Sequence, residues 1–260
     1  MITGRTALLA IVADPVAQAR APVLVNRALA ERGVDAVLVP LHVGSDGLAA
    51  LLHALRGVRN FAGGLFSMPH KTALVALLDD VAPEARRVGA CNVVRREPDG
   101  RLVGTMYDGE GFVAGLRGAG HDVRGRRVLL AGAGGAAAAI AFALGKHGAA
   151  ALTIHNRTAA TAESLAARVR GAWPALRVAL GSDKRGHDVV VNATSLGMRP
   201  GDPLPLDVAG LGPEMLAADV VISSTPTPFL AAAAARGATV HHGEPMLAAQ
   251  IELILDFMLR

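Results

Sequence analysis

The sequence predicts an α/β protein with two domains, and two observations carry this prediction. First, apolar runs of strand length alternate with longer segments of helical periodicity almost throughout the 260 residues, which is typical of mostly parallel sheets covered by helices. Second, the glycine-rich turn Gly132-Ala133-Gly134-Gly135 directly follows one apolar run and opens an alanine-rich helix. With 52% hydrophobic residues, the chain can bury an ordinary core.

The first half of the chain alternates strands and helices and then forms a hairpin. The apolar run 7–12 reads into Asp14-Pro15 without a small-residue cleavage site, so we expect a core strand there and not a signal peptide. Pro98-Asp99-Gly100 is a hairpin turn signal, which predicts an antiparallel edge on an otherwise parallel sheet. The expected elements are strand 7–12, helix 23–32, strand 36–40, helix 48–55, strand 61–65, helix 72–79 and hairpin strands 92–96 and 102–105.

The second half repeats the alternation of strand and helix. We expect the chain to cross between domains near the helix that begins at Asp108, which gives domains of residues 1–107 and 108–243, with the last helix (244–260) packing back on the first domain. The expected elements are helix 108–119, strand 127–131, helix 136–147, strand 152–155, helix 159–169, strands 178–180 and 189–192, and, past residues 219–222, helices 229–235 and 246–259.

Composition argues against several classes of partner. The formal net charge is +4, but the arginines are scattered and aromatic residues make up 3% of the chain, so we expect no nucleic-acid surface. No apolar stretch reaches the roughly 20 residues that a membrane-spanning helix requires. The single cysteine, Cys91, cannot form an internal disulfide, which fits a cytoplasmic location. We expect no metal site.

The glycine-rich turn predicts a Rossmann-like, dinucleotide-binding second domain. Gly132 permits a tight turn, the following residues let backbone N–H groups approach a pyrophosphate, and the helix N-terminus offers it partial positive charge. Ala136 is small enough for the helix to lie close to the strand. The alternative is an ordinary tight turn, since such turns need glycine in any α/β protein.

Asn156-Arg157-Thr158 follows the next strand, where an NAD-binding protein would show an acidic residue for the ribose 2′-hydroxyl. A guanidinium can bind a 2′-phosphate, which favours NADP over NAD. The alternative is that this segment only caps the following helix, with Thr158 as N-cap. A third polar segment, Asn192 to Met198, ends another buried strand; it predicts a further ligand contact, or a loop that caps itself.

In order and over nearly the whole chain, these segments resemble the shikimate dehydrogenase family. Ser67-Met68-Pro69-His70-Lys71 is similar to the family's Thr-x-Pro-x-Lys loop, and Gly89-Ala90-Cys91-Asn92 to its Gly-Ala-x-Asn. Residues 104–111 keep the glycines and the aspartate of Gly-x-Asn-Thr-Asp-x-x-Gly, and residues 132–136, 156–158, 192–198 and 243–250 complete the series. The resemblance implies reduction of a cyclic ketone by NADPH, in the type case 3-dehydroshikimate in the shikimate pathway of aromatic amino acid biosynthesis.

By this resemblance Lys71 and Asp108 are the catalytic pair, and the chemistry of the residues agrees. Oxidation of a secondary alcohol removes the hydroxyl proton as hydride leaves, so a base must lie within hydrogen-bond reach. Lysine can serve in proton transfer, whereas arginine cannot, and Lys71 is one of only three lysines in the chain. The alternatives are a solvated cation at a helix start for Lys71 and an N-cap for Asp108.

The resemblance also assigns binding residues. Asn92 and Gln250 match residues that bind the substrate's ring hydroxyls, and Ser67 keeps the hydroxyl of a position that is usually threonine. The residues assigned to the cofactor are Gly132, Ala133, Gly134, Gly135, Ala136, Asn156, Arg157, Thr158, Thr194, Val220 and Gly243.

The sequence departs from the family at the substrate's carboxylate. The family motif ends in Ser-x-Ser-Pro, whose hydroxyls bind that group, but Ala19 and Ala21 occupy both positions here. Arg20, between them, is a candidate substitute cation, and the alternative is a solvent-facing arginine. Ile222 replaces a usual tyrosine, and Thr161 replaces a second basic residue common in NADP-using relatives. These changes indicate a divergent paralogue of the housekeeping enzyme.

The leading hypothesis is therefore an NADP-linked dehydrogenase that acts on shikimate or a related cyclic hydroxy acid, working as a monomer or homodimer. One alternative is an NAD-linked quinate or shikimate dehydrogenase, against which Arg157 argues. Another is a catalytically silent nucleotide-binding regulator, against which the survival of both Lys71 and Asp108 argues, because a binder needs no proton-transfer pair.

Overall fold

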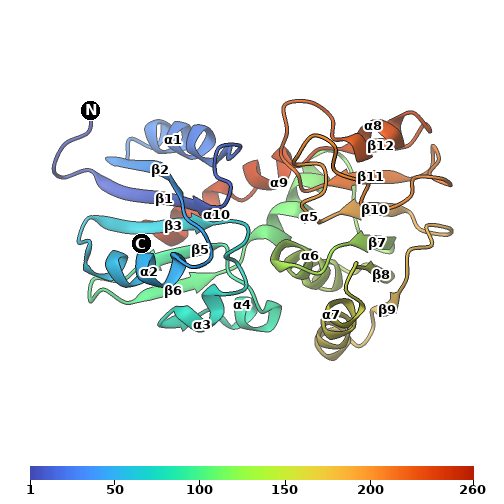
Figure 1. The fold of residues 1–260 in the computed structure, drawn as a ribbon, viewed down its shortest axis with the longest axis horizontal. Helices are drawn as coiled ribbons and strands as arrows, with labels where there is room; N and C mark the ends of the chain where they lie inside the picture. The colour runs from blue at the N-terminus through green and yellow to red at the C-terminus, as the bar shows by residue number, and fades with distance from the viewer. The chain divides into compact units, whose positions relative to one another are not determined.

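Two six-stranded sheets organise the chain, and each is flanked by its own helices (Figure 1). The computed structural model describes all 260 residues. Contacts within it divide the chain into unit 1, formed by Met1–Tyr107 and Gln250–Arg260, and unit 2, formed by Asp108–Ala249. The predicted α/β class is confirmed. No helix is both long enough and apolar enough to span a bilayer.

Unit 1 contains a mixed sheet of strand order β2-β1-β3-β5-β6-β4, in which β5 is antiparallel to both of its neighbours. Burial explains the interior strand β1, because its residues 9 to 13 are all buried. The helix α1 buries Ala21, Val25 and Leu29 at helical spacing. The strands are β1 (Ala7–Ala13), β2 (Ala36–His42), β3 (Phe61–Phe66), β4 (Asp80–Val81), β5 (Val93–Arg96) and β6 (Leu102–Thr105). The helices are α1 (Ala21–Glu31), α2 (Leu48–Gly57), α3 (Leu74–Leu77), α4 (Pro83–Val88) and α10 (Ile251–Met258).

The predicted helix over residues 72–79 is wrong in its length. Only α3 is helical there, and the chain then becomes extended, forms β4 and enters α4, which the sequence did not predict. The cause is a non-local pairing: the N–H of Asp79 donates to the carbonyl of Leu102 (3.0 Å), and the Asp79 carboxylate accepts the Leu102 N–H (2.8 Å). Pairing with β6 therefore replaces the last helical turn.

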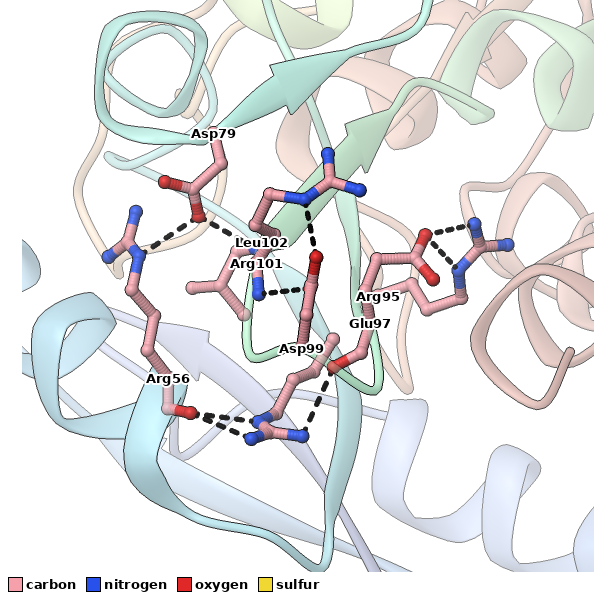
Figure 2. Close-up of polar contacts among 8 residues, drawn as sticks. Arg56, Asp79, Arg95, Glu97, Asp99, Arg101 and Leu102 are labelled. Carbon is pink, nitrogen blue, oxygen red and sulfur yellow. Dashed lines mark hydrogen bonds and ion pairs between the residues drawn. The ribbon is translucent and has the colours of Figure 1, made fainter.

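Arginine–carboxylate contacts fix the hairpin of β5 and β6 (Figure 2). Nε of Arg56 lies 2.9 Å from Oδ2 of Asp79, the same oxygen that accepts the Leu102 N–H. At the turn, Nε of Arg101 lies 2.8 Å from the Asp99 carboxylate. Through Asp79, the start of β6 is thus connected to the segment before β4 and to α2.

Replacing Asp79 with asparagine is expected to lower the free energy of unfolding by roughly 1 kcal/mol near neutral pH, a modest value because both side chains of the Arg56–Asp79 pair are 30% exposed. The hydrogen bond from Arg56, followed by that from the Leu102 N–H, holds the pKa of Asp79 below its usual value. A lowered folded-state pKa stabilises the protein above the unfolded-state pKa, and this stabilisation is lost as the pH falls through the folded-state value. Urea titrations of both proteins should therefore differ at pH 7, and the difference should shrink as the pH falls below about 4, the unfolded-state value, and vanish below the lowered folded-state pKa; an equal difference at every pH would contradict the pairing.

Unit 2 contains an all-parallel sheet of order β12-β11-β10-β7-β8-β9, with β7 and β10 at its centre. Residues 137–144 of α6 are all buried, which explains why the alanine-rich helix is apolar on every side. The strands are β7 (Arg127–Ala131), β8 (Ala151–His155), β9 (Arg177–Leu180), β10 (Val189–Asn192), β11 (Leu216–Asp219) and β12 (Thr239–His241). The helices are α5 (Asp108–Gly118), α6 (Gly135–Lys146), α7 (Ala159–Ala172), α8 (Pro228–Ala234) and α9 (Glu244–Ala248).

Two further features differ from the prediction. β11, which the sequence did not predict, ends at Asp219, whose carboxylate accepts the N–H of Val221 at 2.8 Å and turns the chain out of the sheet. The single helix expected over 246–259 is two helices, α9 and α10, separated at Gln250. The first of them belongs to unit 2 and the second to unit 1, so the chain crosses between units at residues 249 and 250. β12 was not predicted.

Candidate active site

In unit 1, the predicted substrate residues follow the sheet strands at one edge. Ser67 and Lys71 lie in the loop after β3, and Asn92 immediately precedes β5, which runs in the opposite direction and so begins where β3 ends. Asp14 follows β1 at the same edge. Its N–H donates to the Met68 carbonyl (3.0 Å), and the Ser67 N–H donates to the Val12 carbonyl (2.9 Å). This is the edge where open α/β sheets bind ligands.

The backbone of the Lys71 loop is held on two sides. The His70 side chain is 1% exposed, and its Nε2 donates a hydrogen bond to the Val43 carbonyl at 2.9 Å. On the other side, the Lys71 carbonyl accepts the N–H of Cys91 at 2.8 Å. The loop that carries Ser67 and Lys71 is therefore fixed to the segments that follow β2 and precede β5. Sequence reasoning did not single out His70, because its role depends on a contact 27 residues away.

Asn92 and Gln250 form one buried amide pair, although they are 158 positions apart. Nδ2 of Asn92 donates to Oε1 of Gln250 at 2.9 Å, and Oδ1 of Asn92 accepts the N–H of Tyr107 at 2.8 Å. The two side chains are 4% and 2% exposed. These contacts assign the orientation of both amide groups, so the structure brings together two of the predicted substrate residues. Such amides can donate to and accept from hydroxyl groups.

Arg20 occupies the position before α1, where it is the N-cap residue and its side chain is exposed. It has helical backbone angles, and it makes no side-chain capping bond to the helix. Ala19 is half-buried and Ala21 is 4% exposed. The structure thus places Arg20 in the loop between β1 and α1, at the carboxyl end of β1.

In unit 2, the predicted cofactor residues meet at the carboxyl edge of the sheet. The final residues of β7 and β8, Ala131 and His155, are direct neighbours, and the N–H of Gly132 donates to the His155 carbonyl at 2.7 Å. Gly132 has a φ of +116°, and a Cβ atom there would lie 2.7 Å from the Ala193 carbonyl oxygen. Only glycine satisfies both conditions.

The start of α6 suits a phosphate group. Gly134 is its N-cap residue, no side chain caps the helix, and its first turn contains no acidic residue. A Cβ atom at Gly134 would meet no atom within 4 Å, so space remains beside the first turn. Backbone N–H groups and the helix dipole at such an end attract an anion. Gly132 to Ala136 therefore fit a pyrophosphate.

Arg157 and Thr158 are exposed after β8, next to this turn. Thr158 is the N-cap residue of α7, but its side chain makes no capping bond. Instead, Nδ2 of Asn156 donates to the Thr158 carbonyl at 3.0 Å. Thr158 is thus the N-cap residue, as the alternative interpretation predicted, but without a side-chain capping bond, and no carboxylate occurs in the first turn of α7 to repel a phosphate.

A buried polar network joins the ends of β10 and β11. The Asp219 carboxylate, 1% exposed, accepts Nδ2 of Asn192 at 3.0 Å and the Thr227 hydroxyl at 2.7 Å. Oδ1 of Asn192 in turn accepts the N–H and the hydroxyl of Thr194. Burial raises the pKa of Asp219, and the hydrogen bonds it accepts oppose that rise. The network fixes the Thr194 segment, and sequence reasoning missed Asp219 as its centre.

Gly243 lies against the segment that follows β11. A Cβ atom there would be 2.6 Å from the carbonyl oxygen of Val221 and 2.8 Å from that of Val220. Two of the predicted cofactor residues, Val220 and Gly243, are thus brought together by a backbone contact that a side chain would prevent.

Asp108 is the first residue of α5 and is 4% exposed. It belongs to unit 2, whereas Lys71 belongs to unit 1. The neighbouring Glu110 binds Lys146 at 2.8 Å and His147 at 3.0 Å. Burial would raise the pKa of Glu110, but these two partners outweigh it and lower that pKa. No group of three or more His, Cys, Asp or Glu side chains is arranged to hold a metal ion.

Comparison with known proteins gives consistent matches. Residues 11–94 match the model of the shikimate dehydrogenase substrate binding domain, and residues 117–197 match that of shikimate / quinate 5-dehydrogenase. The shikimate dehydrogenase (NADP(+)) of Geobacter metallireducens is 38% identical, with 98% of this chain and 91% of the relative covered.

Two solved structures extend the match to the fold. Shikimate 5-dehydrogenase from Thermus thermophilus, in complex with NADP(H) and shikimate, has a TM-score of 0.85 at 34% identity and covers 97% of this chain and 93% of its own. The 5-ketofructose reductase of Gluconobacter sp. strain CHM43 has a TM-score of 0.83 at 34% identity and covers 99% of this chain and 94% of its own.

Proposed function

Since this chain belongs to the shikimate dehydrogenase family, we propose that it transfers hydride reversibly between NADP(H) and a secondary alcohol of shikimate or a related cyclic hydroxy acid. It is an NADP-dependent oxidoreductase acting on CH–OH groups. The observation that carries the substrate proposal is the edge of the unit 1 sheet, where Ser67 and Lys71 share one fixed loop beside the Asn92–Gln250 pair.

We assign the proton transfer to Lys71 and Asp108. NADP, when bound, supplies or accepts the hydride. As the alcohol is oxidised, its hydroxyl proton passes to Nζ of Lys71, and in the reverse reaction Lys71 returns a proton to the oxygen of the ketone. Asp108 supplies the negative charge that balances the lysine. Asn92, Gln250 and Ser67 orient the substrate by binding its remaining hydroxyl groups, which fixes the reacting carbon.

The residues of unit 2 fit the cofactor. We assign the pyrophosphate to Gly132 through Ala136 and the adenosine end to Asn156, Arg157 and Thr158. The nicotinamide end is assigned to Thr194, Val220 and Gly243, which lie at the ends of β10 and β11 and before α9. The uncapped start of α6 and the absence of an acidic residue from the first turn of α7 support this division.

Replacing Arg157 with alanine is expected to raise KM for NADP by about 10- to 100-fold, because one charge-assisted contact to the 2′-phosphate contributes roughly 1.5 to 3 kcal/mol. KM for NAD should change little, since NAD lacks that phosphate. Steady-state rates with both cofactors at saturating shikimate measure the effect. Equal changes in KM for NADP and for NAD would show that Arg157 stabilises the loop and does not bind the 2′-phosphate.

Arg20 is assigned to the substrate as a donor to one of its oxygens. Arg20→Ala should therefore raise KM for the substrate by about 10-fold and leave kcat nearly unchanged, because it removes binding shared by the ground state and the transition state. Initial rates over a range of shikimate concentrations, with NADP saturating, provide the measurement. An unchanged KM would remove Arg20 from the site.

The function itself is tested by NADP-linked oxidation of shikimate and quinate, followed by NADPH absorbance. We expect turnover of at least one compound that depends on enzyme concentration. Tight binding of NADPH without turnover of any cyclic alcohol would leave a nucleotide-binding protein without dehydrogenase activity, and the proposal would fail.

A further inference from the structure

The corner of the unit 1 sheet where β1 and β2 end contains two carboxylates, one of them paired with a histidine. The Asp14 carboxylate follows β1, and it lies 2.8 Å from Nε2 of His42 at the end of β2. A Cβ atom on Gly44 would be 2.7 Å from Oδ1 of Asp46 and 3.9 Å from Oδ2 of Asp14. Two carboxylates therefore flank one glycine in this corner. A substrate carboxylate that entered it would meet like charge, which is unfavourable.

Apart from the exposed side chain of Arg20, the loop between β1 and α1 offers few donors to a carboxylate. Ala19 and Ala21 have methyl side chains, so neither can donate a hydrogen bond. The N–H of Ala19 is taken by the Val16 carbonyl (2.9 Å), and Pro22, in the first turn of α1, has no N–H.

N–H groups in the first turn of α1 also have hydrogen-bond partners within the chain. The N–H groups of Val23 and Leu24 both donate to the Arg20 carbonyl, at 3.1 and 3.2 Å. The bond from Leu24 is the first intrahelical bond, as that from Ala138 is in α6, but with Val23 also bonded and Pro22 lacking an N–H, the first turn of α1 keeps few N–H groups for an anion.

Apart from Lys71, which is assigned to proton transfer, the remaining groups at this edge are suited to neutral hydroxyl groups. The Asn92 and Gln250 amides each carry both a donor and an acceptor, and the Ser67 hydroxyl can do both. The Asp14 carboxylate can accept a hydrogen bond from a hydroxyl, and it lies in the same edge as Ser67 because its N–H donates to the Met68 carbonyl. Recognition here favours O–H groups over a carboxylate.

We propose that this site selects an uncharged polyhydroxylated ketone, of the ketose or cyclitol-ketone class, in preference to a hydroxy acid of the same size. The inference rests on the proposed function, because it concerns the substrate of the same reaction. In the reduction, the carbonyl carbon gains hydride from NADPH and its oxygen gains a proton through Lys71, giving a secondary alcohol and NADP⁺. No step of this reaction uses a carboxylate.

A matched pair of probes tests the selection. Shikimate and methyl shikimate carry the same ring hydroxyl groups and differ in charge, so their kcat/KM values with NADP compare the two classes directly. A cyclitol ketone such as an inosose, and a ketose, are then offered for reduction by NADPH. Uncharged alcohols are compared with shikimate in oxidation, and uncharged ketones with 3-dehydroshikimate in reduction. We expect kcat/KM for at least one uncharged probe to exceed that for the corresponding acid by about 10-fold, the scale of one hydrogen bond to a charged group.

The double substitution Ala19→Ser/Ala21→Ser provides the reciprocal test. It restores two hydroxyl donors to the β1–α1 loop, so the ratio of kcat/KM for methyl shikimate to that for shikimate should fall about 10-fold. Asp14→Asn should lower the same ratio by removing one of the two charges. Because each readout is a ratio within one protein preparation, a partly unfolded variant does not change it.

The outcomes separate the two levels of the argument. If kcat/KM for shikimate and for 3-dehydroshikimate is higher than for every uncharged probe, the inference is overturned while the proposed function stands. If no compound of either class turns over although NADPH binds, the proposed function fails, and the inference fails with it. A higher kcat/KM for an uncharged probe than for the acids supports both the proposed function and the inference.

Discussion

Lys71→Met is expected to lower kcat by about 10²- to 10⁴-fold, the usual contribution of a positioned proton-transfer group. The side chain lies on a loop that is fixed through His70 and Cys91, so the substitution removes the amine without releasing the backbone. NADPH affinity should stay within about twofold, because the assigned cofactor residues all lie in unit 2. Stopped-flow rates with saturating substrate, together with NADPH fluorescence titration, give both quantities.

Two further variants make this result specific. Lys71→Arg keeps the positive charge but cannot release a proton, so it should recover part of the substrate affinity and little of kcat. Lys184→Met removes a different lysine, one that pairs with Asp207 in unit 2, and should leave kcat within about twofold. If Lys71→Met kept more than about a tenth of the wild-type kcat, another group would have to carry the proton.

The second large effect is expected at Asp219. Asp219→Ala removes the acceptor of three hydrogen bonds, from Asn192, Val221 and Thr227, inside a region that water does not reach. Each buried donor left without a partner costs roughly 1 to 3 kcal/mol, so the free energy of unfolding of unit 2 should fall by about 3 to 5 kcal/mol. KM for NADP should also rise, since Thr194 loses its support through Asn192.

Urea unfolding followed by tryptophan fluorescence measures this change, because the single tryptophan, Trp173, lies in unit 2. Asp207→Ala is the matched control: its side chain is 73% exposed, and its removal should cost no more than about 0.5 kcal/mol. A loss at Asp219 as small as that at Asp207 would mean that the network contributes little to stability.

The sequence alone predicted those features that depend on neighbouring residues. The turn at Gly132 and the strand before it were read correctly because a positive φ and a close backbone approach leave a local signal, glycine. The α/β class followed from periodicity in the same way. Most of the central strands and long helices were placed to within about two residues.

Features that depend on distant partners were not predictable. Residues 78 and 79 read as helix because the pairing of residues 79–81 with β6 is not visible in the local sequence. Strand β11 was not assigned, and the carboxylate at its end binds a partner distant in the sequence, Asn192. The Asn92–Gln250 contact could not be predicted from spacing either: the two residues were named through a family resemblance, and only the fold shows that they bind each other.

Asn92 also has a mechanical consequence. Its one side chain binds the N–H of Tyr107 and the amide of Gln250, and these are the last and first residues of unit 1 at the two points where the chain passes to and from unit 2. Both covalent connections therefore start from a single anchor. A substitution of Asn92 that changes substrate binding also removes hydrogen bonds to the residues at both connections. We therefore expect this position to be among the slowest in the site to diverge.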